Sequence, residues 1–312
     1  MSDLSKESVT WAEVDEGSAG QRIDNYLFKT LKGVPKSHIY RILRSGEVRV
    51  NKKRIDQTYR LQLGDQMRIP PIRVEEKAHV PSVPAAEFPI LFEDDALLVV
   101  YKPAGVAVHG GSGVSFGVIE QLRQSRPQAK FLELVHRLDR ETSGILLLAK
   151  KRSALTHLHE QMRSGKTDKR YLTLVVGEWR NAKQHVKLPL YKYTTAEGER
   201  RVMVREDGQA SHTVFSLQQA YAGYTLLEAQ LKTGRTHQIR VHLSHVGFPI
   251  AGDDKYGDFP KNKELAKQGL KRMFLHAASM RITHPVTGEP LQLQAELPPE
   301  LKKFLAKLAS VS

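Results

Sequence analysis

A proline-rich stretch interrupts the chain after residue 69 and divides it in two. Prolines occupy positions 70, 71, 81 and 84, with two glutamates between them. Proline lacks a backbone donor and has a fixed φ, so this stretch cannot hold a helix or a sheet ladder. For a chain of 312 residues we therefore expect two domains. The expected division is an N-terminal extension at 1–19, a small domain at 20–72, a linker at 73–87 and a larger domain at 88–312.

The small domain carries most of the positive charge. Residues 22–73 include 13 basic and 4 acidic side chains, in a chain whose formal net charge is +14. Such a surface favours a polyanionic partner, because each phosphate contact releases counterions. The alternative is a basic protein whose charge serves solubility alone.

Apolar spacing predicts two helices and a small hairpin in this domain. Ile23, Leu27 and Leu31 share one helix face, and a second helix is expected from Ser37, as its N-cap, to Gly46. The segments GQRIDNYL, SHIYRILRSGEVRVN and LQLGDQMRIP resemble the S4 domain, a small RNA-binding fold, over roughly residues 21–69. Basic side chains that should face solvent and contact RNA are Lys36, Arg41, Arg44, Lys52, Lys53 and Arg54.

The larger domain is rich in strands and has few helices. Apolar runs predict strands at 97–101, 131–135, 145–149, 171–176 and 224–231. Helices are expected at 118–123, 153–162 and 236–246. Because the strands often follow one another directly, the pattern favours an α+β fold with a mixed, largely antiparallel sheet.

A polar decapeptide, VHRLDRETSG at 135–144, lies between two of these strands. Catalytic groups concentrate on loops that a rigid scaffold positions. The alternative is a charged turn, in which Asp139 and Thr142 bond local backbone and Gly144 supplies a positive φ. The pattern alone leaves both interpretations open.

The segment HRLDRETSG resembles the signature of the RluA-type pseudouridine synthases, in which it surrounds one essential aspartate. Three further segments agree in the same order: KPAG with HGG, then KRYL, then TGRTHQIRVH. With the S4-like segment, the resemblance covers nearly all of the chain from residue 21. It implies a pseudouridine synthase fold and a reaction without cofactor, in which the uracil N1–C1′ bond breaks, the base turns and C5 bonds to C1′.

The resemblance also implies roles for individual residues. Asp139 is the catalytic carboxylate, which either attacks the sugar or removes its C2′ proton. Tyr171 lies against the target base. The uridine must be flipped out of folded RNA, and Arg137 is expected to fill the gap that it leaves, with His136 beside it as a further RNA contact.

A buried carboxylate tends toward its neutral form, so Asp139 needs a neighbouring cation to stay ionised. Arg240 is the expected partner, on a helix that begins at Thr236 and places His237 on the same face. Arg235 precedes this helix and is expected to grip RNA phosphate or to shape the pocket. Which of the two arginines pairs with Asp139 stays open.

Several other classes are excluded by what the sequence lacks. Without cysteine the chain has no disulfide, thiolate zinc site or cysteine nucleophile. Histidine spacing matches no metal motif, and no phosphate-binding GxxxxGK[ST] loop occurs. No apolar run approaches the roughly 18 residues of a membrane span, and the N-terminus does not read as a signal peptide. We expect a cytoplasmic monomer without metal, cofactor or membrane contact.

The whole-chain resemblance predicts 23S (large-subunit) ribosomal RNA, modified at more than one uridine, as the substrate and partner. Transfer RNA is the alternative, and the sequence does not say which uridines react. Two other functions compete: a non-catalytic RNA-binding or ribosome-assembly factor, and a metal-dependent nuclease that EDTA would inhibit. The combination of Asp139, Tyr171 and Arg240 argues against a mere binder, which needs none of it.

Overall fold

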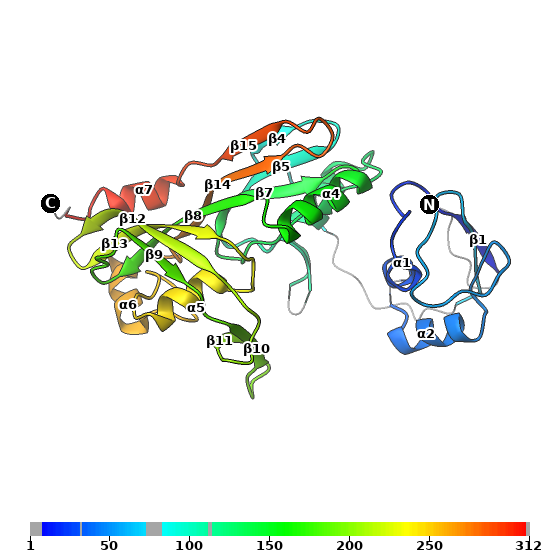
Figure 1. Cartoon of the computed structure of the whole chain (residues 1–312), viewed down its shortest axis with the longest axis horizontal. Helices are drawn as coiled ribbons and strands as arrows, with labels where there is room; N and C mark the ends of the chain where they lie inside the picture. Colours follow the sequence, from blue (N-terminus) through cyan, green and yellow to red (C-terminus); the bar gives the residue numbers. More distant parts are fainter. Residues whose placement is uncertain (1–7, 32, 73–82, 112–113, 310–312) are drawn as a thin grey trace. The chain divides into compact units, whose positions relative to one another are not determined.

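In a computed structural model the chain forms two compact units, Met1–Ser82 and Val83–Ser312 (Figure 1). The structure describes residues 8–31, 33–72, 83–111 and 114–309. Most of the expected linker, residues 73–82, lies outside these ranges. No helix within them is long and apolar enough to cross a membrane.

The N-terminal unit packs two helices against a small antiparallel sheet in the order β1-β3-β2. Apolar side chains from the helices and strands fill one buried core, which fixes this unit independently of the rest. Its elements are β1 (Thr10–Glu13), α1 (Ile23–Thr30), α2 (Lys36–Arg44), β2 (Arg49–Val50) and β3 (Gln66–Ile69).

Two details of this unit differ from the sequence prediction. Strand β1 pairs with β3 although it lies within residues 1–19, expected to be an extension outside the domain. A strand of four residues is too short for its alternation to stand out in a sequence. Helix α2 begins at Lys36 after Pro35, so Ser37 lies in its first turn and is not the N-cap.

The basic side chains assigned to RNA contact in this unit are all exposed. Arg54 has a second task, since its Nη2 donates to the carbonyl oxygens of Arg44 at 3.1 Å and Ser45 at 2.7 Å. It therefore satisfies carbonyls at the end of α2 that the helix itself leaves without partners. The exposed set is Lys36, Arg41, Arg44, Lys52, Lys53 and Arg54.

The larger unit is built on one ten-stranded sheet (Figure 1). The order is β4-β5-β7-β14-β8-β13-β12-β9, with β15 beside β14 and β6 beside β7. Among the described strand pairs of this sheet only β7 and β14 are parallel, which confirms the predicted mixed, largely antiparallel sheet. The strands are β4 (Ile90–Glu93), β5 (Leu97–Lys102), β6 (Glu133–Leu134), β7 (Ser143–Ala149), β8 (Asp168–Val176), β9 (Lys183–Val186), β12 (Thr213–Tyr221), β13 (Tyr224–Leu231), β14 (Leu275–Thr283) and β15 (Pro290–Gln294).

Both faces of the sheet are covered. Successive side chains of a strand point to opposite faces. On β7, Leu146 and Leu148 enter one buried cluster, whereas Ile145 and Leu147 enter another. The covering helices are α3 (Val118–Ser125), α4 (Arg152–Arg163), α5 (Gln238–His245), α6 (Phe259–Lys267) and α7 (Pro299–Leu305), and a separate hairpin pairs β10 (Leu190–Thr194) with β11 (Arg200–Val204).

Three predicted helices correspond to α3, α4 and α5, while α6 and α7 were not predicted. Helix α5 begins two residues after Thr236, because His237 has φ 53° and cannot be helical. The strand predicted at 131–135 is reduced to the two residues of β6.

The polar decapeptide ends where β7 meets β14. Gly144 has φ +113°, and a Cβ there would lie 2.2 Å from the carbonyl oxygen of Ala277 on β14. Only glycine fits this position, which confirms the predicted positive φ at Gly144. The close approach fixes the loop before β7 to the middle of the sheet.

Lys102 ties the end of β5 to the same loop. Its fully buried ammonium donates to the carbonyl oxygens of Pro103 at 2.8 Å, Val106 at 2.7 Å and Arg140 at 3.0 Å. These acceptors favour the charged form, but burial, followed by the nearby Arg272, lowers the pKa of Lys102 to about 7. Lys102 therefore crosslinks the end of β5 to the loop, but at low pH its buried charge lowers the stability of the fold.

This crosslink predicts a pH-dependent stability. An unfolded lysine titrates near pH 10.4, so above about pH 7 the unfolded chain binds more protons than the folded one, and stability rises with pH. Between pH 7 and pH 9 the free energy of unfolding should rise by about 2 kcal/mol more in the wild type than in Lys102→Met. Urea denaturation at both pH values measures this difference.

The matched control is Lys263→Met, at an exposed lysine of α6. It should keep the pH dependence of the wild type. If Lys102→Met also keeps it, the folded ammonium has an ordinary pKa and the account of Lys102 is wrong.

Candidate active site

A cavity of about 1160 Å³ in the larger unit brings the predicted motifs together. Its walls include residues 135–142 before β7, Lys169 and Tyr171 on β8, residues 231–240 after β13, and Asp254 with Lys255. Segments about one hundred residues apart in the chain thus meet at one site. The antiparallel and parallel pairings of β7, β14, β8 and β13 place the ends of these strands side by side.

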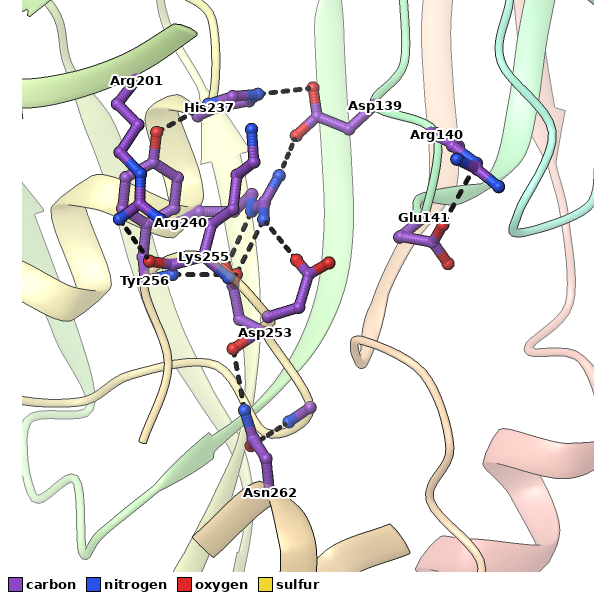
Figure 2. Close-up of polar contacts among 12 residues, drawn as sticks. Asp139, Arg140, Glu141, Arg201, His237, Arg240, Asp253, Lys255, Tyr256 and Asn262 are labelled. Atoms are coloured by element: carbon purple, nitrogen blue, oxygen red, sulfur yellow. Dashed lines mark hydrogen bonds and ion pairs between the residues drawn. The ribbon is translucent and has the colours of Figure 1, made fainter. Parts of the chain in front are cut away.

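Arg240 is the cation that meets Asp139 (Figure 2). Its Nη1 donates to Asp139 Oδ2 at 3.2 Å, and the two side chains are 5% and 26% exposed. Arg235 instead is exposed, and its Nε donates to the carbonyl oxygen of Ala210 at 3.2 Å. The geometry therefore pairs Asp139 with Arg240, the alternative that the sequence left open.

Asp253 holds the other side of the Arg240 guanidinium (Figure 2). Asp253 Oδ2 accepts from Nε at 2.8 Å and Oδ1 accepts from Nη2 at 2.7 Å. Burial opposes the charge on each group, but the bonds between them lower the pKa of Asp253 and raise that of Arg240. Asp254, whose side chain is largely exposed, also accepts from Nη2 at 3.4 Å, so three carboxylates share the buried guanidinium and Asp253 binds it most closely.

The loop that carries Asp253 is itself fixed. Asp253 Oδ1 also accepts from the backbone N–H groups of Lys255 at 2.8 Å and Tyr256 at 3.1 Å. Asn262 on α6 donates to the Asp253 carbonyl and accepts from the Gly252 N–H, each at 2.8 Å. The sequence shows two adjacent acids here, Asp253 and Asp254, but nothing in their spacing links them to Arg240, so sequence analysis missed Asp253.

His237 forms a second contact to the carboxylate. Its Nε2 lies 3.9 Å from Asp139 Oδ1, and its Nδ1 lies 2.8 Å from the Tyr256 hydroxyl, which accepts from the Val202 N–H at 3.0 Å. Burial lowers the pKa of His237, so the imidazole is neutral. In the tautomer that accepts from the Tyr256 hydroxyl at Nδ1, the imidazole proton is on Nε2, the nitrogen nearer Asp139.

Tyr171 forms the wall opposite these polar groups. It is buried, and its neighbours across β13 and β14 are the small residues Ala229 and Ala277. Burial, and then the charge of Asp139, raise the pKa of Tyr171, so its phenol stays protonated. Small neighbours leave the ring as a flat surface at the cavity.

The two residues before Leu138 behave differently from each other. Arg137 is exposed at the cavity, as its expected contact with RNA requires. The ring of His136 is turned inward, and its Nε2 accepts from the Leu147 N–H on β7 at 3.1 Å. Burial, with Lys169 nearby, lowers the pKa of His136 to about 3. His136 therefore secures the loop to the sheet while it also lines the cavity, and its contact with RNA stays a prediction.

Within the part of the chain that the structure describes, no group of three or more histidine and carboxylate side chains could hold a metal ion. The acids of the cavity are bound to Arg240 and to backbone N–H groups instead.

Comparison with known proteins agrees with these motifs. Residues 96–245 match the RNA pseudouridylate synthase family, and residues 21–67 match the S4 domain. The ribosomal large subunit pseudouridine synthase C of Pasteurella multocida is 57% identical over 97% of this chain and 94% of its own length. The protein of the same name from Escherichia coli K12 is 54% identical over 96% of this chain and 97% of its own length.

A solved structure shares the fold of the larger unit. Human RNA pseudouridylate synthase domain containing 4 superposes with a TM-score of 0.58 at 26% identity, over 70% of this chain and 91% of its own length. The family expected from HRLDRETSG is thereby confirmed. The chain belongs to the RNA pseudouridylate synthase family.

Proposed function

We propose that this protein isomerises specific uridines to pseudouridine in 23S (large-subunit) ribosomal RNA, with Asp139 as the catalytic carboxylate. The relatives named ribosomal large subunit pseudouridine synthase C, which are 54–57% identical along nearly the whole chain, support the choice of RNA. The observation that carries the chemistry is the ion pair of 3.2 Å between Asp139 and Arg240 at the cavity.

Charge balance at the site suits this role. One guanidinium faces the carboxylates of Asp139 and Asp253 and, at 3.4 Å, the exposed Asp254, so the acids of the cluster outnumber its cation. Arg240 gives Asp139 one hydrogen bond and Asp253 two. Asp139 is therefore oriented by a guanidinium that other carboxylates also bind, and either attack on C1′ or removal of the C2′ proton requires an oriented carboxylate.

Tyr171 supports the base. Its buried ring offers a flat surface for the uracil, and its protonated phenol can hydrogen-bond to the base while the base turns. We assign to it stacking and assistance in the loss of the C5 proton.

RNA binding is assigned to the exposed basic residues of the N-terminal unit and to Arg235 at the cavity. Flipping the uridine costs roughly a few kcal/mol, which Arg137 offsets by filling the gap in the stack. We infer a monomer acting in the cytoplasm.

The carboxylate is tested by mapping pseudouridine in RNA from cells that lack this protein. Carbodiimide treatment and primer extension should show specific large-subunit signals lost and then restored by the wild type. Asp139→Asn should restore none, because an amide can neither attack the sugar nor accept its proton. Asp95→Asn, at an exposed acid far along the chain, should restore all of them.

Restoration by Asp139→Asn would show that another group is the catalyst. If the deletion removes no signal from any RNA, the non-catalytic binding factor replaces the enzyme. Loss of transfer RNA signals instead would correct the substrate alone.

Base flipping by Arg137 predicts a dependence on RNA structure. Arg137→Ala should lower turnover on folded large-subunit RNA by roughly tenfold or more, because no side chain fills the stack. On a short single strand with the same uridine the loss should be much smaller, since little stacking is broken. Equal turnover by wild type and variant on folded RNA would rule out this role.

A further inference from the structure

A second cavity, of about 280 Å³, opens beside the active-site cavity. It is bordered by the turn between α4 and β8, by residues 230–234 at the end of β13, and by Arg281 on β14. Lys169 and residues 231–234 line both cavities. A ligand in the main cavity can therefore extend into this second cavity, the side pocket.

Four cations and one carboxylate line the side pocket. The carboxylate, Asp168, is already bound within the protein, since it accepts from Arg170 Nε at 3.0 Å and from Gln230 Nε2 at 2.9 Å. Its negative charge acts mainly on Arg170 and more weakly on Lys232, so one carboxylate that is already bound faces four cations. The cations are Lys166, Lys169, Lys232 and Arg281.

Lys169 is the most enclosed of these cations. Its side chain is half-buried at the border of the two cavities, and burial lowers its pKa. Among residues 8–31, 33–72, 83–111 and 114–309, no carboxylate lies within ion-pair distance of its ammonium. A partly desolvated cation without a counter-ion is unfavourable, and an anionic ligand in the pocket would remove that cost.

The position of Lys169 suggests which anion this is. Lys169 and Tyr171 are two residues apart on β8, so they share one face of the strand about 7 Å apart. Tyr171 lies at the place of the target base. Each nucleoside in RNA has a phosphate on either side, so a uridine held at Tyr171 brings one of its two phosphates to the entrance of the side pocket.

We propose that Lys169, together with Lys232 and Arg281, binds the phosphate group that flanks the isomerised uridine, an inference that rests on the function proposed above. The side pocket then fixes the direction of the RNA strand through the active site. It acts on binding and register, whereas Asp139 and Arg240 act on the bond that breaks.

The test replaces single phosphates of the RNA. A large-subunit RNA fragment carries an uncharged methylphosphonate at the linkage either 5′ or 3′ of the target uridine. With the wild-type full-length protein, one of these two replacements should weaken binding roughly tenfold, as expected for loss of one charge-assisted contact. If neither replacement weakens binding, the proposal is overturned, whatever the variants do.

A double-mutant cycle then assigns the contact to Lys169. Lys169→Met should bind the unmodified fragment roughly tenfold more weakly and should be insensitive to the methylphosphonate, because the partner charge is gone. The slope of log affinity against log salt should fall by about 0.7. Lys169→Arg, which keeps the charge, and Lys263→Met, on α6, should keep the sensitivity. A full methylphosphonate effect in Lys169→Met would assign the phosphate to other residues.

Pseudouridine formation on the unmodified fragment is measured in the same samples. Its absence with the wild type contradicts the proposed function. Its presence, together with indifference to both methylphosphonates, contradicts the side pocket alone.

Discussion

The active site depends on one buried guanidinium that several carboxylates share. Arg240 is only 5% exposed, and a buried charge is tolerated only when it is paired and hydrogen-bonded. Asp253 supplies the two shortest bonds, Asp139 one at 3.2 Å and the exposed Asp254 one at 3.4 Å. These bonds hold Arg240 in place, and Asp139, which is 26% exposed, faces the cavity. The left-handed turn at His237 starts α5 where Arg240 can reach both acids.

Two largely buried basic side chains bind backbone carbonyl groups of the loop that carries Asp139. Lys102 binds the carbonyl oxygen of Arg140 at 3.0 Å, and Arg272 binds that of Glu141 at 3.1 Å. Gly144 then joins the loop to β14 at a distance that only glycine allows. The backbone on the C-terminal side of Asp139 is therefore rigid, and catalytic precision at the carboxylate follows from contacts that never meet the substrate.

Much of this arrangement could be predicted from the sequence, and the features that could not be predicted have physical explanations. The motif HRLDRETSG, the strand at 224–231 and the pairing of Asp139 with an arginine of GRTHQIR were all accessible, because they rest on local pattern or on resemblance. Strand β1 was not predicted because its four residues show no clear alternation of apolar and polar side chains. Asp253 and the contact of His136 with β7 were not predicted because each is defined by a tertiary contact, with Arg240 and with the Leu147 N–H respectively, that residue spacing does not indicate.

The shared guanidinium is tested most directly by steady-state kinetics of Asp253→Asn on a large-subunit RNA fragment, with thermal melting of the same samples to verify folding. Without the Asp253 carboxylate, Arg240 shifts and Asp139 loses its orientation. Misplacing a catalytic group by roughly 1 Å costs up to about 100-fold in rate. We predict that kcat of Asp253→Asn falls about 10–100-fold while its KM for RNA stays unchanged. A folded Asp253→Asn protein with wild-type kcat would contradict it, because Arg240 would then orient Asp139 without help from Asp253.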